Sequence, residues 1–429
     1  MDQNEHTILF DAERCIGCVA CSVACPTRAI RVRHSLARLK PELCIDCGAC
    51  VEACAYEAAR ARTSSPSDLQ RFRYRVAIPS LTLYAQFGRD VHPAQVLDAL
   101  TRLGFESAYD LSWMSETLGQ ATDAWLTESR GPWPKISVTC PAIVRLIQIR
   151  YPELLPNLIP LESGRELAAK MLRRRLTAEH GLAPEDIGIF FVTPCTAIMN
   201  SILAPVGLDR SHFDGAFALN ELYGPLLKAI KQGGPGDPDA RISARGVMWA
   251  LAGGMTAGMR NANTMTVHGM RDVQFVFDRI EAGKFQSVDF IEAWSCPDGC
   301  VSGGLTMEGR YAAQRAIQHL VKRLGEQDHP VKEEKVRAML REHFFDLEEE
   351  IRARESRSAA RDLREAIAWK KERAALLARL PRKDCAACGA PDCATLADDI
   401  LRGEASLDDC VFLRIARLEG RGESEERKR

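Results

Sequence analysis

The sequence predicts an α/β core with a small cysteine-rich domain at each end. Between residues 75 and 325, short apolar β-rich runs alternate with helical stretches, which is the pattern of an α/β architecture. The cysteines are distributed unevenly: eight lie in 15–54, four in 140–300 and four in 385–410. Clustered cysteines in a chain without other disulfide signals indicate metal binding.

Composition excludes several function classes. The 429 residues suffice for two or three domains, and the formal net charge of −1 gives no sign of nucleic-acid binding. The longest apolar stretch, 187–199, is interrupted by Pro194 and is too short to span a membrane. The N-terminus lacks the apolar centre of a signal peptide. We therefore expect a soluble cytoplasmic protein whose cysteines hold metal in a reducing, anaerobic setting.

The N-terminal region, 1–63, contains two cysteine runs with the same spacing. CIGCVACSVACP and CIDCGACVEACA both read C-x2-C-x2-C-x3-C, the spacing of bacterial two-cluster ferredoxins. In that arrangement the fourth cysteine of each run crosses to the other [4Fe–4S] cluster. The expected ligand sets are Cys15, Cys18, Cys21 and Cys54 for one cluster, and Cys44, Cys47, Cys50 and Cys25 for the other.

A pair of zinc knuckles is the alternative for these runs, but zinc sites usually use two separated cysteine pairs or include histidine. At position 55 an alanine stands where the ferredoxin run usually has proline. Strands in HTILFDAER and AIRVRH, with a short helix after each run, predict a small α+β bacterial-ferredoxin-like domain. Residues 61–68 form the predicted linker out of it.

The core, 75–325, places cysteines at the ends of predicted strands. The expected strands are YRVAIPSLTL, WPKISVTC, IGIFFVTPC, HFDGAFAL, VQFVFD and SVDFIEAWSC, and the expected helices include PAQVLDALTRLG and GRELAAKMLRRRLTAEHG. Sites in α/β folds usually lie in the loops after strand ends. We therefore expect Cys140, Cys195, Cys296 and Cys300 to converge on one four-thiolate site. Taken singly, Cys140 and Cys195 could instead be ordinary core cysteines.

Four stretches of this core resemble the catalytic domain of [FeFe] hydrogenases. They are ALTRLGFESAYD, VTCPAIVRLIQIRYPELLPNLIP, LAPEDIGIFFVTPCTAIMNS and FIEAWSCPDGCVSGG. The resemblance implies an α/β hydrogenase-like core in which Cys140, Cys195, Cys296 and Cys300 hold a cubane. It further implies that Cys300 bridges to a two-iron subsite carrying CO and cyanide.

The pocket that the resemblance assigns to the two-iron subsite differs from the family pattern. Thr139 stands in place of the proton-relay cysteine, and its hydroxyl does not release a proton as a thiol does. Ile198 replaces the lysine that donates to cyanide, which removes a charge-assisted hydrogen bond. Trp294 is bulkier than the methionine it replaces. Thr193 stands for the other methionine and Ser201 for a glutamate of the proton path.

Two other features of the core are interpreted as structural and not as chemical sites. GGMTAGM, 253–259, lacks the Gly-Lys-Ser/Thr ending of a phosphate loop, so we expect tight packing near the cluster. His268 follows the strand-like TMTV run and is expected to be a structural histidine with its hydrogen bonds satisfied.

The C-terminal part begins with a charged helical spacer, 326–380, which either is solvated or pairs with a partner helix. Residues 381–413 follow with the spacing C-x2-C-x4-C-x16-C, given by Cys385, Cys388, Cys393 and Cys410. This segment resembles the small four-cysteine [4Fe–4S] domain of electron-transport and corrinoid proteins, so we expect a helical cluster-binding domain. The tail, 414–429, is predicted to be disordered.

The sixteen cysteines thus form four sets of four, predicting four [4Fe–4S] clusters. Three functions fit this pattern. The first is electron transfer or redox and hydrogen sensing by a protein with a divergent hydrogenase-like core, working with a redox or signalling partner. The second is an active hydrogenase of low turnover, with a two-iron subsite at Cys300. The third is a regulatory scaffold stabilised by its clusters.

Overall fold

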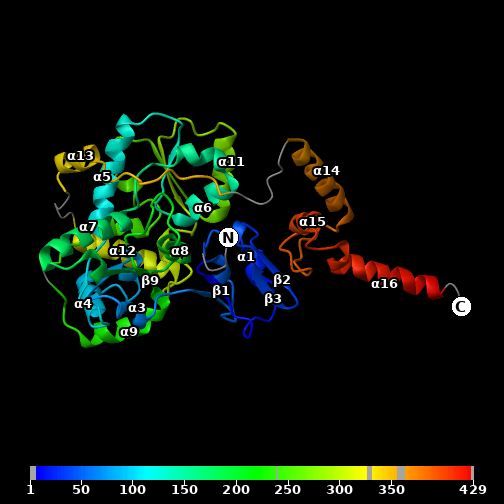
Figure 1. Cartoon of the computed structure of the whole chain (residues 1–429), viewed down its shortest axis with the longest axis horizontal. Coiled ribbons are helices and arrows are strands. Elements are labelled where there is room, and N and C mark those ends of the chain that lie inside the picture. The colour runs from blue at the N-terminus through cyan, green and yellow to red at the C-terminus, as the bar shows by residue number, and fades with distance from the viewer. Residues whose placement is uncertain (1–5, 238–239, 326–330, 355–362, 427–429) are drawn as a thin grey trace. The chain divides into compact units, whose positions relative to one another are not determined.

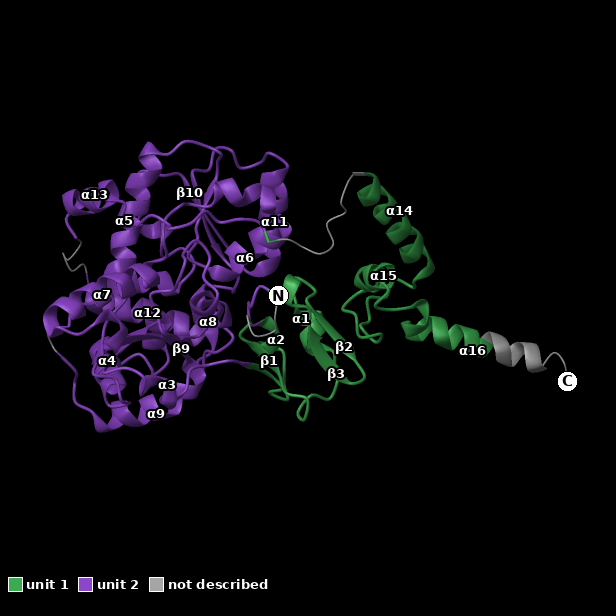
Figure 2. Ribbon diagram, in the orientation of Figure 1, with its two compact units in different colours: residues 1–44, 49–60, 354–429 green, residues 45–48, 61–353 purple. Residues whose placement is uncertain are grey.

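The chain forms two compact units, shown in different colours in Figure 2. The computed structural model describes residues 6–237, 240–325, 331–354 and 363–426. Unit 1 contains residues 1–44, 49–60 and 354–429, and unit 2 contains residues 45–48 and 61–353. The N-terminal and C-terminal cysteine-rich regions, which are far apart in the sequence, therefore belong to the same unit.

Unit 2 is built on two parallel sheets, which confirms the α/β core. The first has the strand order β6-β5-β8-β9, with bounds β5 Tyr74–Pro79, β6 Ser107–Ala108, β8 Ile187–Thr193 and β9 Gly215–Ala218. The second has the order β10-β11-β7, with bounds β7 Lys135–Ile136, β10 Thr264–His268 and β11 Phe290–Trp294. Every residue of β8 and β11 is buried, as expected for strands covered on both faces.

Helices pack around these sheets (Figure 1). Their bounds are α3 Pro66–Leu69, α4 Pro93–Thr101, α5 Ser112–Glu128, α6 Pro141–Arg150, α7 Gly164–His180, α8 Thr196–Leu203, α9 Leu219–Gln232, α10 Ala244–Val247, α11 Met270–Glu281, α12 Arg310–Leu324 and α13 Glu333–Arg341. Most predicted elements are present. Both named helices and five of the six named strands form, although only two residues of WPKISVTC are extended.

One predicted strand is wrong. VQFVFD lies inside helix α11, not in a strand. Val273, Val276, Phe277 and Ile280 are its buried residues, at the spacing of one helix face. The alternation of apolar residues within the six-residue run was too short to separate a strand from this longer helical period.

Unit 1 combines two small sheets with helices. Strands β1 (Ile8–Phe10) and β4 (Ala59–Ala61) form one sheet, and β2 (Ile30–Arg33) and β3 (Leu36–Leu39) form an antiparallel hairpin. The helices are α1 Ala20–Ala24, α2 Ala49–Glu52, α14 Leu363–Arg379, α15 Cys393–Leu401 and α16 Val411–Glu426.

The C-terminal half departs from the predicted pattern in two places. The helix expected over most of 331–356 stops at Arg341, where α13 ends. Residues 414–426 continue helix α16, whereas the sequence predicted disorder. The predicted spacer also includes residues 326–330 and 355–362, and the predicted tail includes 427–429, all of which lie outside the described residues.

One close backbone approach fixes a segment that lines the candidate site. A Cβ added to Gly246, in α10, would lie 1.7 Å from the carbonyl oxygen of Ser112 at the start of α5. The short 3₁₀ helix η6, Met248–Ala250, follows immediately and supplies Trp249 to the candidate site. Glycine is therefore required at position 246 by the space available.

We expect Gly246→Ala to lower the free energy of unfolding by about 1–3 kcal/mol, because overpacking forces the backbone to shift. Gly258→Ala is the matched control, since a Cβ there meets no atom within 4 Å. The control should change stability by no more than about 0.5 kcal/mol. Denaturant unfolding of both variants under anaerobic conditions measures the difference, and equal midpoints would contradict the steric argument.

Candidate iron–sulfur and hydrogenase-type site

The four core cysteines come from three strand ends. Cys140 precedes α6 after β7, Cys195 precedes α8 after β8, and Cys296 follows β11. Cys300 begins the 3₁₀ helix η8, Cys300–Ser302. Because the strands of both sheets run parallel, these ends can meet at one place.

The structure brings the four thiols together. Burial is the largest cause that raises the pKa values of Cys195, Cys296 and Cys300. The charges of the other cysteines raise them further, with Cys140 acting on all three. Ser295 lies between two of the sulfurs: its Oγ is 3.5 Å from Cys140 Sγ and 3.7 Å from Cys296 Sγ. A thiol set that resists ionisation alone is the donor set expected where a metal compensates the thiolate charge.

Backbone groups also face this site. The N–H groups of Ala197 and Ile198, in the first turn of α8, hydrogen-bond to Cys195 and lower its pKa against the effect of burial. A helix N-terminus favours a thiolate in this way. The local sequence Pro194-Cys195-Thr196 places the cysteine at the N-cap of α8.

A cavity of about 60 Å³ borders Cys300. Among the described residues that line it are the three pocket residues singled out from the sequence, Thr139, Ile198 and Trp294. Trp249 and Arg165 also line it. The volume is small, enough for a few water molecules. Cys300 is the one cysteine among these described lining residues.

Arg165 is the functional residue that the sequence reasoning missed. It follows Gly164 in the first turn of α7, and its guanidinium donates to the carbonyl oxygen of Thr139 and to Ser201 Oγ, each at 3.2 Å. Its Nε has no hydrogen-bond partner within the described part of the chain. Burial lowers its pKa, while the carboxylate of Glu166 first, and then the thiolates of Cys195, Cys140 and Cys300, favour its charged form. No regular spacing links Arg165 to the cysteines, so the sequence pattern did not predict it.

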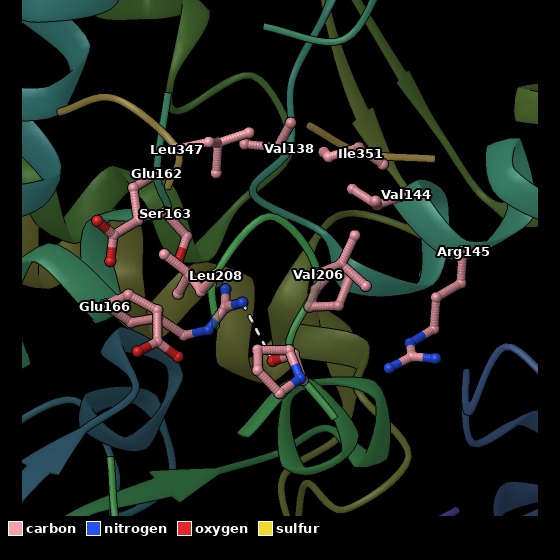
Figure 3. A pocket seen from close by; sticks show the side chains of 14 residues that line it. Val138, Val144, Arg145, Glu162, Ser163, Glu166, Val206, Leu208, Leu347 and Ile351 are labelled. Atoms are coloured by element: carbon pink, nitrogen blue, oxygen red, sulfur yellow. Dashed lines mark hydrogen bonds between the residues drawn. The ribbon is translucent and has the colours of Figure 1, made fainter. Parts of the chain in front are cut away.

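Arg165 also borders a second cavity, of about 50 Å³, whose other walls are drawn in Figure 3. Two buried carboxylates line it. Glu166 accepts hydrogen bonds from Ser211 Oγ at 2.9 Å and from the backbone N–H of His212 at 2.8 Å. Glu162 lies 3.2 Å from Lys170 Nζ. Burial raises the pKa of Glu162 to about 7, although Lys170 opposes the change.

The glycine-rich segment 253–259, for which the sequence predicted tight packing near the cluster, packs around a buried carboxylate. Glu292 accepts from the backbone N–H groups of Gly253 and Thr256, at 3.0 and 2.9 Å. It also accepts from Trp294 Nε1 at 2.7 Å, which holds the indole in place. His268 Nδ1 accepts from the backbone N–H of Asp298 at 3.1 Å, which agrees with its predicted structural role.

In unit 1, Cys54 of the second run lies with three cysteines of the first. Cys15, Cys18, Cys21 and Cys54 line one cavity of about 20 Å³. Burial raises the pKa of Cys21 to about 11, and the other three thiolates contribute. Backbone N–H groups point at the sulfurs: Ala37 donates to Cys15 Sγ at 3.4 Å and Ala58 to Cys54 Sγ at 3.2 Å.

The remaining ferredoxin-type cysteines are described by their burial, their unit and one hydrogen bond. Cys44 and Cys50 are buried in unit 1, and Cys25 Sγ accepts from the Ala29 N–H at 3.1 Å. Cys47 is half-buried and belongs to the 45–48 segment of unit 2.

The C-terminal cysteines surround the start of α15. Burial raises the pKa of Cys388, and the charges of Cys385 and Cys410 contribute. Cys388, Cys393 and Cys410 share one apolar cluster, while Cys385 is exposed. In each set the donors are thiols with backbone N–H groups nearby, a chemistry that fits an iron–sulfur cubane.

Comparisons with known proteins agree with this geometry. The family model for the iron only hydrogenase large subunit, C-terminal domain, matches residues 74–203 and 241–304. A 4Fe-4S dicluster domain model matches 7–55, and an Fe-S cluster model matches 380–412. The core of the chain, residues 74–304, is a divergent domain of the [FeFe] hydrogenase family.

The curated relatives of this hydrogenase-family chain are distant. It is 24% identical over 266 residues to Iron hydrogenase 1 of Clostridium pasteurianum, covering 51% of this chain and 46% of the relative. It is 25% identical over 362 residues to the periplasmic [Fe] hydrogenase large subunit of Nitratidesulfovibrio vulgaris, covering 70% of this chain and 86% of the relative. The chain thus spans under half the length of the first relative.

A solved structure shows the same fold. A variant of the [FeFe]-hydrogenase HydA1 from Chlamydomonas reinhardtii superposes with a TM-score of 0.50 at 15% identity, covering 68% of this chain and 97% of that chain. In the described residues of the present chain, no helix has the length and apolar character needed to cross a membrane.

We expect Glu162 to keep its proton up to about pH 7, well above the ordinary range of a glutamate. A protonated-carboxyl C=O stretch should disappear around pH 7 in infrared difference spectra and be missing from Glu162→Gln. Because the folded protein keeps this proton while the unfolded chain loses it, stability should fall as pH rises from 4.5 to about 7. The variant should lack this fall. Glu153→Gln, at an exposed glutamate, is the control, and a band that persists in Glu162→Gln would contradict the assignment.

Proposed function

We propose that this chain is a multi-cluster iron–sulfur protein that transfers electrons or reports redox state to a partner. The observation that carries the proposal is the core site. Four cysteines lie together beside a small cavity bordered by Thr139, Ile198 and Trp294. These three side chains offer neither the proton-relay thiol nor the cyanide-binding cation of the family pattern, so the chemistry that we propose is that of the cubane, with Arg165 as the cation that also lines the cavity.

Each of the four cysteine sets would hold one [4Fe–4S] cluster, which when bound supplies one-electron transfer. The chain's own groups do the rest. Thiolates bind the iron, and N–H groups such as those of Ala29, Ala37 and Ala58 donate to the ligand sulfurs. Such hydrogen bonds stabilise negative charge on the sulfurs and so favour the reduced state.

At the core site Arg165 provides the missing positive charge. A cubane with four thiolate ligands is anionic, and burying it without a cation is costly. Arg165 has no carboxylate within ion-pair distance among the described residues, although the charge of Glu166 favours its ionised form more than the thiolates of Cys195, Cys140 and Cys300 do. Arg165 therefore supplies positive charge beside the core cubane.

The proposed partner is a redox protein or a signalling protein, and the proposed location is the cytoplasm. The near-neutral charge of the chain gives no reason to propose nucleic acid. The periplasmic relative shows that the family itself is not confined to the cytoplasm.

Slow hydrogen turnover is the second candidate. It is favoured by one observation: Cys300 and Arg165 both border the 60 Å³ cavity, where a two-iron subsite would sit. The fit is partial. The cavity is small, Trp294 occupies one wall, and Thr139 cannot act as a thiol acid. Glu162, in the second cavity that Arg165 also borders, has a pKa of about 7, which is suited to proton transfer.

Infrared spectroscopy on anaerobic protein, co-produced with hydrogenase maturation proteins, separates the two candidates. We expect no iron-bound CO or cyanide stretches, together with about sixteen irons per chain, as four cubanes require. An authentic [FeFe] hydrogenase matured in parallel is the control. Clear CO and cyanide bands would contradict the electron-transfer proposal and favour the hydrogenase.

A further inference from the structure

The C-terminal four-cysteine segment is docked on strand β2 of the ferredoxin-type region, within unit 1. The backbone N–H of Val32 donates to the carbonyl oxygen of Gly389 at 2.8 Å, and Arg33 Nη1 donates to the carbonyl oxygen of Cys388. A Cβ at Gly389 would lie 1.7 Å from the Val32 oxygen. The cysteine loop therefore touches β2 backbone to backbone.

Charge complementarity fixes this contact. Arg31 and Asp399 form a bidentate pair with bonds of 2.6 and 2.9 Å, and their side chains are only 6% and 1% exposed. Arg28 pairs with Asp392 at 2.7 Å, and Lys40 pairs with Glu404. Basic side chains thus lie on the ferredoxin-type side and acidic ones on the C-terminal side. Removing one partner of such a buried pair leaves an uncompensated buried charge, which is strongly destabilising.

The same strand borders the first ferredoxin-type site. Val32 lines the cavity formed with Cys15, Cys18, Cys21 and Cys54, and it shares an apolar cluster with Cys21. One residue, Val32, therefore contacts the C-terminal cysteine loop through its backbone and the first cysteine set through its side chain. Electron tunnelling falls off steeply with distance, so contact of both sites with one strand favours transfer between them.

We propose that the C-terminal site exchanges electrons with the Cys15, Cys18, Cys21 and Cys54 site across β2. This inference rests on the proposed function and adds the order of its electron path. One electron leaves one site, which is oxidised, and reaches the other, which is reduced, with no proton moved and no bond formed. Cys385 is exposed, so an external one-electron donor can approach the C-terminal site.

Glycine substitutions test the contact in the full chain. Gly389→Ala adds the clashing Cβ at a residue with φ of +81°. Gly403→Ala is the matched control, since its φ is +72° but a Cβ there meets no atom within 4 Å. Both variants carry the same kind of backbone strain, and only the first forces the loop away from β2.

A charge substitution gives a second test that leaves the cysteine loop unchanged. Asp399→Asn removes the charge facing Arg31. Asp398→Asn, at the adjacent residue of α15, removes a charge that instead faces Arg373 of α14 at 2.6 Å. The pair compares loss of the docking contact with loss of a contact inside the C-terminal segment.

The measurement is electron paramagnetic resonance of the protein reduced with dithionite. The C-terminal signal is identified by its loss in Cys393→Ser. We expect this signal to be split and fast-relaxing in the wild type, Gly403→Ala and Asp398→Asn, through magnetic coupling to the neighbouring centre. Coupling should be lost in Gly389→Ala and weakened in Asp399→Asn, at unchanged iron content. If Gly389→Ala loses iron, Asp399→Asn decides.

An uncoupled C-terminal signal in fully loaded wild type would overturn this inference and leave the proposed function intact. The same holds if both docking variants keep the wild-type coupling. A wild-type chain with no C-terminal iron–sulfur signal after anaerobic reconstitution would overturn the proposed function of that region as well.

Discussion

The arrangement of unit 2 depends on keeping four thiols together inside the protein beside one positive charge. Burial and mutual repulsion raise the pKa values of Cys195, Cys296 and Cys300, so the set cannot hold its charge alone. Arg165 is the cation that faces it from α7. The parallel strands bring the cysteines to one place, and the first turn of α7 brings the guanidinium.

This constraint explains why the fold can persist while the pocket changes. The cysteines sit at strand ends and helix N-termini, where backbone geometry fixes them. Thr139, Ile198 and Trp294 line only the adjoining cavity, so their identities alter the chemistry beside Cys300 without moving the thiols. Residues around a metal site tune it nearly as strongly as its ligands do. A pocket with these residues on a hydrogenase-type fold supports the proposed electron-transfer role.

The cysteine sites could be predicted from the spacing of the cysteines. Contacts between residues far apart in the sequence could not be predicted. The alternating pattern predicted β8 and β11 and hence the loops that carry Cys195 and Cys296. It failed at α11, where a short apolar run obscured a helical period. Arg165 and the pairing of Arg31 with Asp399, 368 residues apart, left no local signal. Both depend on how elements pack, which propensity and periodicity do not encode.

The most direct test of this account is the midpoint potential of the core site. It is measured by a redox titration, monitored by electron paramagnetic resonance, in wild type, Arg165→Lys and Arg165→Met. Removing the cation should destabilise the more negative reduced state. We expect Arg165→Met to lower the potential by roughly 60–150 mV, since about 1.4 kcal/mol corresponds to about 59 mV for one electron. Arg165→Lys should retain most of the wild-type value. An unchanged potential in Arg165→Met, or no redox signal that depends on Cys195 and Cys300, would contradict the account.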